Sequence, residues 1–91
     1  MEMWNTLEEK LNNGKIDEVL SELTDWIAHT ETPSDTAYYL LGNAYRKKGD
    51  WQHALNNYLE AITLNPDSPA KQAYEMAMDI LNFYNKDMFN Q

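Results

Sequence analysis

The sequence contains no cysteine. Disulfide bonds, thiol nucleophiles and zinc sites built on cysteine are therefore excluded, and nothing indicates an oxidising compartment. Glycine and proline are scarce, with three residues of each. The glycines, Gly14, Gly42 and Gly49, are isolated from one another in the sequence, so they do not form a glycine-rich loop that could hold a phosphate group.

Positive charge is also in short supply. Seven Lys and Arg residues stand against 15 Asp and Glu, which gives a net charge of −8 at neutral pH. This imbalance argues against nucleic acid and anionic membrane surfaces as partners. No apolar run approaches the ~20 residues that span a bilayer, and the first residues do not resemble a signal peptide. We therefore expect a cytoplasmic protein.

The 91 residues suffice for one domain, and their apolar members form a repeat. One stripe with helical spacing occupies Trp51, Ala54, Leu55, Tyr58, Ala61 and Ile62. The same spacing occurs 35 residues earlier, at Ile16, Val19, Leu20, Leu23, Trp26 and Ile27. A further stripe matches at an offset of 34, with Tyr38, Leu41, Gly42 and Tyr45 corresponding to Trp4, Leu7, Glu8 and Leu11. A unit of two helices is thus present twice.

Capping residues mark where these helices begin and end. Gly14 and Gly49 lie between paired stripes, where a left-handed backbone conformation ends a helix. Ser34, Asp50 and Ser68 are placed to cap the helices that follow them, and Pro69 suits a first helical position. The predicted helices span residues 2–12, 16–30, 35–48, 51–64 and 69–84. No segment alternates with a period of two, so the predicted fold is all-α.

The second unit carries a recognisable set of residues. Its first helix has two large residues, a glycine and an aromatic residue at Tyr38, Leu41, Gly42 and Tyr45. Its second helix has a small, an aromatic and a small residue at Ala54, Tyr58 and Ala61, and Pro66 follows. In this pattern, residues 35–68 resemble a tetratricopeptide repeat.

The resemblance extends over most of the chain. Residues 1–34 resemble a degenerate copy, residues 69–84 a C-terminal capping helix, and residues 85–91 form a tail. It implies a single domain of two antiparallel helix-turn-helix repeats plus the capping helix, stacked as a short right-handed superhelix. The first copy has Glu8, Val19 and Trp26 where the second has small residues, which a terminal repeat tolerates. Met1 and this relaxed first copy favour a complete chain.

No set of residues forms a catalytic or metal-binding pattern. Adjacent carboxylates, as at Glu8-Glu9, point about 100° apart on a helix and cannot act together on a substrate. His29 and His53 lack the spacing of metal ligands. We therefore expect a non-catalytic protein with no cofactor and no bound metal.

The resemblance also implies a function. In tetratricopeptide arrays, the first helix of each pair lines a concave face that receives a peptide or partner helix. Transferred to this sequence, that face comprises Asn5, Glu9, Thr36, Tyr39, Asn43 and Arg46, followed by Ala70, Ala73 and Ala77. Asn43 matches an asparagine that binds the peptide backbone in the chaperone-binding members, but the other residues of their two-carboxylate clamp are missing. The expected function is therefore a protein–protein interaction module.

Two features leave alternatives open. Residues 1–34 hold two basic and eight acidic side chains, which either steer a basic or amphipathic partner or serve solubility alone. The cluster Arg46-Lys47-Lys48 either complements the helix dipole or contributes to the binding face.

The end of the chain carries apolar residues beyond the packing stripe of the last helix. These are Phe83, Met88 and Phe89. Either a second copy or another protein docks on them, or the tail folds back and covers the end of the stack. Docking of a second copy would make the chain a self-associating assembly subunit. The expected state is a monomer or a weak homodimer.

Overall fold

The computed structural model describes residues 2–89, with the side chains of residues 2–83, and within this range it contains five helices and no strand. The helices are α1 (Glu2–Asn12), α2 (Ile16–His29), α3 (Asp35–Lys48), α4 (Trp51–Leu64) and α5 (Ala70–Phe89). The prediction of an all-α fold is confirmed. The first four helices begin and end within one residue of their predicted bounds.

The fifth helix is longer than predicted. It ends at Phe89, whereas the sequence pattern placed its end at residue 84 and a tail from residue 85 onward. No glycine or proline follows Pro69, so no residue interrupts the helix once it has begun. Most of the predicted tail is therefore a continuation of α5, which at ~1.5 Å per residue extends over about 30 Å.

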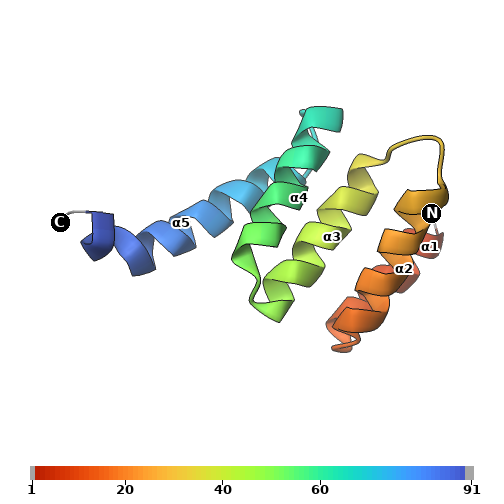
Figure 1. Ribbon diagram of the computed structural model, residues 1–91, viewed down its shortest axis with the longest axis horizontal. Coiled ribbons are helices and arrows are strands. Elements are labelled where there is room, and N and C mark those ends of the chain that lie inside the picture. Colours follow the sequence, from red (N-terminus) through yellow and green to blue (C-terminus); the bar gives the residue numbers. More distant parts are fainter. Residues whose placement is uncertain (1, 90–91) are drawn as a thin grey trace.

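The helices form a stack in which consecutive helices pack against each other (Figure 1). The contact between α3 and α4 is the most extensive, α2 packs on α3, and α5 packs on α4. Helix α1 contacts both α2 and α3. The last part of α5 projects beyond the other helices, which contributes to dimensions of 46 × 28 × 19 Å (Figure 1).

Predicted capping residues fix the central helices. The Ser34 hydroxyl accepts a hydrogen bond of 3.4 Å from the backbone N–H of Ala37 at the start of α3. The Asp50 carboxylate accepts one of 3.2 Å from the N–H of His53 at the start of α4. Between the two helices, Gly49 has a φ of +89°, where a side chain would be strained. These contacts set the tight turn that makes α3 and α4 antiparallel.

The core has two clusters of buried residues. The first joins α1, α2 and α3 through Leu7, Leu11, Val19, Leu23, Ala37, Leu40, Leu41 and Ala44. The second joins α4 and α5 through Ala54, Tyr58, Ala61 and Ala70. Tyr58 is fully buried, and its ring lies directly against Gly42 of α3. A Cβ atom at position 42 would overlap this ring, so the close approach of α3 and α4 requires glycine there.

Candidate functional site

Two hollows flank helix α3. One, of about 230 Å³, lies between α3 and α5 and is lined mainly by Tyr39, Asn43, Arg46, Ala73, Met76, Ala77 and Ile80. The other, of about 150 Å³, lies between α1 and α3 and is lined by Glu8, Leu11, Asn12, Asn43, Arg46 and Lys47. Asn43 and Arg46 line both hollows, so the two lie next to each other along α3. We call the pair the central groove.

A chain of hydrogen bonds fixes the middle of the central groove. The buried hydroxyl of Tyr58 donates to the side-chain oxygen of Asn43, with an O···O distance of 2.6 Å. Arg46 donates from Nε to the same hydroxyl, with an N···O distance of 3.3 Å. The amide NH₂ of Asn43 and the outer nitrogens of Arg46 make no further hydrogen bond within residues 2–83. These donors are therefore available to a ligand in the groove.

The environment of Tyr58 favours its neutral form. Burial raises the pKa of the phenol, and the nearby Arg46 guanidinium opposes that rise. Since the neutral hydroxyl is also the donor to Asn43, the same condition keeps the hydrogen-bond chain intact.

The two halves of the central groove differ in chemistry. On its α5 side the groove is mainly apolar, with Ala73, Met76 and Ile80 facing Tyr39. On its α1 side it is polar, and it holds Glu8 and the cations of α3. A ligand that fits both halves is therefore amphipathic.

The predicted face residues fall into two groups. Tyr39, Asn43 and Arg46 lie together in the central groove. Thr36 is half-buried near the start of α3 and lines neither hollow. Asn5 and Glu9 are exposed on α1 and do not line the α1–α3 hollow, where Glu8 and Asn12 take that place.

The difference in α1 has a geometric reason. A groove between two parallel helices is lined by side chains that face the neighbouring helix, and these lie about one position away from those that point straight outward. The same reason applies to α5, where the sequence did not indicate Met76 and Ile80. A helical projection that weighs the direction of the neighbour would have found them.

Alanines of the last helix behave differently from one another. Ala73 and Ala77 lie along the α3–α5 hollow, whereas Ala70 lies in the cluster with Tyr58 and lines neither half of the groove. The side chains of Ala70 and Ala77 are both fully buried. Phe83, predicted as a self-association residue, is 69% exposed on α5. The side chains of Met88 and Phe89 lie outside the described residues.

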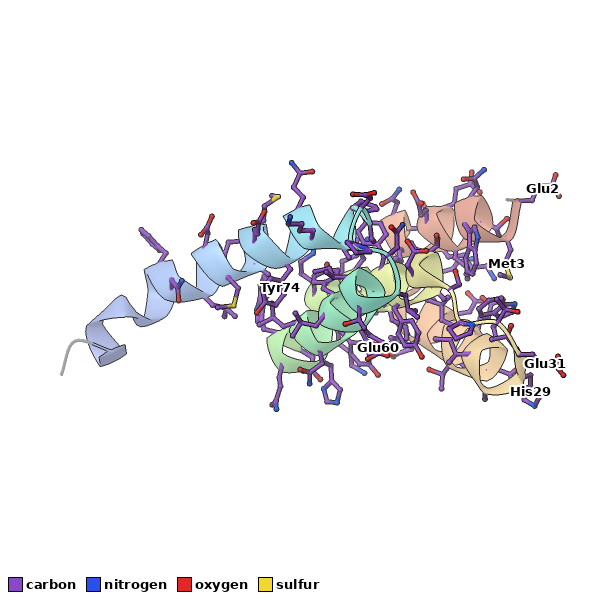
Figure 2. All side chains as sticks on the ribbon, turned by 90° about the horizontal axis from the view of Figure 1, so that it is seen from above. Glu2, Met3, His29, Glu31, Glu60 and Tyr74 are labelled. Carbon is purple, nitrogen blue, oxygen red and sulfur yellow. The ribbon has the colours of Figure 1, made fainter. Side chains whose placement is uncertain are left out.

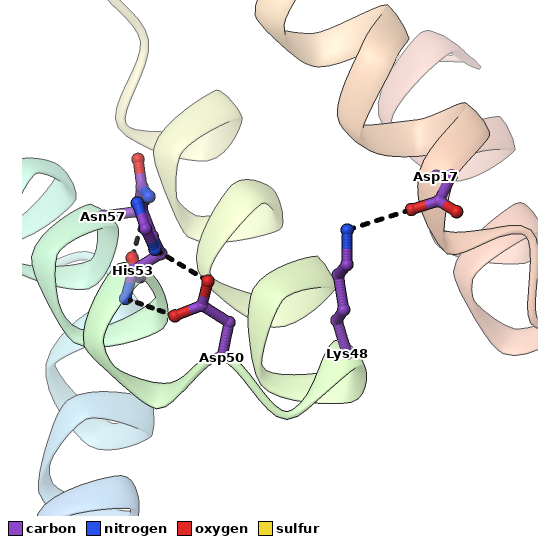
Figure 3. A network of polar contacts seen from close by, with 5 residues as sticks. All are labelled: Asp17, Lys48, Asp50, His53 and Asn57. Atoms are coloured by element: carbon purple, nitrogen blue, oxygen red, sulfur yellow. Dashed lines mark hydrogen bonds and ion pairs between the residues drawn. The ribbon is translucent and has the colours of Figure 1, made fainter.

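The other polar side chains around the turn between α3 and α4 stabilise the fold (Figure 3). Lys48 of α3 lies 3.3 Å from the carboxylate of Asp17 in α2 and joins the two helix pairs. The His53 ring lies 2.7 Å from the Asp50 carboxylate and stacks on the Tyr45 ring at 5.0 Å. No group of three or more possible metal ligands occurs among the described residues.

Stacked antiparallel helix pairs with a groove along the first helix of each pair define a helical repeat protein. The family model for the tetratricopeptide repeat matches residues 36–68. The solution NMR structure of Bacteroides fragilis protein BF1650 is 58% identical and has a TM-score of 0.86, with 100% of this chain and 92% of that chain covered. The chain belongs to the tetratricopeptide repeat family, whose repeats are protein–protein interaction modules that bind protein partners.

No curated protein matches the chain. Within the described residues, none of the helices combines the length and the hydrophobicity needed to cross a membrane.

Proposed function

We propose that the chain is a non-catalytic module that binds a peptide or partner helix in its central groove. The observation that carries this proposal is the meeting of two hollows at Asn43 and Arg46, where free donors lie beside an apolar wall. At about 230 Å³, the α3–α5 hollow is smaller than the ~300–1,000 Å³ of small-molecule sites. It suits one large apolar side chain of a partner.

The polar half of the groove orients the bound partner through hydrogen bonds. The Asn43 amide is placed to donate to a backbone carbonyl of the partner, and the Arg46 guanidinium is placed to donate to an acceptor next to its apolar side chain. The acidic first 34 residues act at longer range, where they raise the association rate of a basic or amphipathic partner.

The test uses peptides selected from a random library on the wild-type protein. A selected peptide should shift the amide resonances of Tyr39, Asn43 and Arg46 and leave those of Glu60, on the outer face of α4, in place. Met76→Glu should abolish binding because it puts a charge into the apolar wall. The control Glu60→Gln should bind as the wild type does. Shifts confined to residues outside the groove would contradict the proposal.

A second candidate function is self-association through α5. It is favoured by an apolar row at helical spacing, in which Met76 is 61% exposed, Ile80 39% and Phe83 69%. Two such rows would pack against each other and form a homodimer, with Met88 and Phe89 extending the contact in our proposal. Light scattering over a range of concentrations separates a monomer of 10.7 kDa from a dimer of twice that mass.

The two candidate functions exclude each other at the molecular level. Met76 and Ile80 belong both to the exposed row and to the wall of the central groove. A peptide bound in the groove should therefore dissociate a dimer formed through α5. If the mass stays at the dimer value while the groove is saturated, the dimer uses another surface.

A further inference from the structure

A third and larger hollow, of about 620 Å³, lies at the open end of the first helix pair. It is formed by the first turns of α1 and by the end of α2 with the loop that follows, and it shares no lining residue with the central groove. Figure 2 shows Met3 on one side of this end and His29 and Glu31 on the other. We call it the N-terminal hollow.

The N-terminal hollow exists because the first repeat departs from the pattern of the second. Trp26 occupies the position at which the second repeat has the fully buried Ala61. Its ring meets Trp4 of α1 edge-on, with 5.2 Å between the ring centroids. Two indoles need more room than an alanine and a tyrosine, so α1 and α2 are held apart, and their contact is far less extensive than that of α3 and α4.

The loops that follow the two helix pairs also differ from each other. At the end of the second helix pair, the Asn65 amide donates to the Asp35 carboxylate across 3.2 Å and ties the end of α4 to the start of α3. The corresponding residue of the first pair, Thr30, instead donates to the carbonyl of Thr32 within its own loop. The end of the first pair therefore stays open where that of the second is closed.

The open end combines an apolar floor with an acidic rim. Met3, Leu7 and Trp26 form the floor, and Met3 is 36% exposed. Carboxylates of Asp25 and Glu31 stand at the rim, where the carbonyl end of α2 adds the negative end of its helix dipole.

Some carboxylates at the rim lie close to basic side chains. Glu22 lies 2.8 Å from Lys10, which leaves it the least available of the carboxylates. Asp25 lies 3.5 Å from the His29 ring, and both side chains are more than 70% exposed. Glu31 has no ion-pair partner within the described residues. The net field at the rim is therefore negative, in agreement with the acidic first repeat.

We propose that the N-terminal hollow binds a cationic amphipathic segment of a partner protein. An apolar side chain of the segment covers Met3 and Trp26, and Lys or Arg side chains lay their aliphatic stems over the floor and reach Asp25 and Glu31. Charge complementarity and the apolar floor together select this partner, because an acidic or wholly polar segment satisfies only one of them. The chain would then carry two separate binding surfaces.

The probe for this proposal is a helical peptide of about four turns made of Lys and Leu on opposite faces, with a Glu and Leu peptide as its counterpart. Binding is measured by calorimetry at low ionic strength. The wild type should bind the Lys peptide and not the Glu peptide. The double variant Asp25→Asn/Glu31→Gln should bind the Lys peptide roughly fivefold more weakly, since two rim contacts are lost.

Matched variants separate a site from a general charge effect. Glu60→Gln/Asp67→Asn makes the same change in net charge on α4 and the following turn, and it should bind as the wild type does. Met3→Gln changes no charge and should weaken binding through the floor. Equal weakening by both double variants, no effect of Met3→Gln, or no binding by the wild type would each overturn the proposal.

The variant Met76→Glu distinguishes binding in the central groove from binding in the N-terminal hollow. Loss of Lys-peptide binding on Met76→Glu would place that peptide in the central groove and overturn the second site alone. Circular dichroism of each variant checks that the helices are retained.

Discussion

The hydroxyl of Tyr58 donates to the side-chain oxygen of Asn43 across 2.6 Å, from the buried face of α4 to the groove side of α3. The ring that fills the core between the two helices thus also holds a residue of the candidate binding surface. Because Arg46 donates to the same hydroxyl, one buried oxygen positions both polar side chains of the central groove. Packing and recognition are coupled at this atom.

Removing that oxygen should therefore affect both properties. Tyr58→Phe keeps the ring but leaves Asn43 and Arg46 without their shared partner, and we expect a loss of about 1–2 kcal/mol in the free energy of unfolding. Urea denaturation measures this change. Tyr38→Phe is the control, since its hydroxyl makes no hydrogen bond within the described residues, and an equal loss in both variants would contradict the role assigned to the Tyr58 hydroxyl.

Alkaline conditions should act on the same residue. The folded pKa of Tyr58 is raised by burial, so its contribution to stability is complete below the unfolded value of about 10 and is lost as the pH rises through the folded pKa. Near-ultraviolet absorbance of tyrosinate should show one of the six tyrosines ionising late, together with loss of helix. In Tyr58→Phe this late step should be absent.

Replacing Gly42 with a larger residue should destabilise the protein. Gly42→Ala places a methyl group against the buried ring of Tyr58, and overpacking costs ~1–3 kcal/mol, of which better helix propensity recovers at most about 1 kcal/mol. Thermal unfolding measures the net loss. The double variant Gly42→Ala/Tyr58→Leu should show a smaller loss than the sum of the single variants. If the losses in stability are strictly additive, a methyl group at position 42 does not clash with the ring of Tyr58.

Acid should weaken the start of α4. The N–H of His53 is the main cause of the lowered pKa of Asp50, and the His53 ring adds to it. Since the folded pKa lies below the unfolded value of about 3.9, this stabilisation is present above that value and is lost as the pH falls through the folded pKa. Asp50→Asn keeps a capping oxygen without a charge. Its urea midpoint should fall less than that of the wild type between neutral pH and pH ~3.

Most of the fold could be predicted because its signals are local. The apolar spacing, the caps at Ser34 and Asp50, and the turn at Gly49 each act within a few residues, and each occurs where the sequence placed it. The end of α5 could not be predicted in this way, because no stop residue follows Pro69 and an apolar stripe marks only the part of a helix that packs.

The candidate site was only partly predictable. The resemblance to tetratricopeptide repeats predicted Tyr39, Asn43 and Arg46, which line the groove from α3. It could not find Met76 or Glu8, because their part in the groove depends on the angle between neighbouring helices. The N-terminal hollow was missed for a related reason. Trp26 stands out in the sequence only as a departure from the repeat, and its effect on the spacing of α1 and α2 is a property of the packed structure.

The order of contacts along the stack bears on how the chain folds. Each helix packs on its neighbours in the sequence, with α1 and α3 as the longest-range pair among the main contacts of the described residues. Such short loops close quickly, so folding should take microseconds to milliseconds and begin at the α3–α4 hairpin. Amide hydrogen exchange should then be slowest in α3 and α4 and fastest toward α1 and the projecting end of α5. The ends of the protein would open and close while the α3–α4 hairpin, which carries Tyr39, Asn43 and Arg46, remains formed.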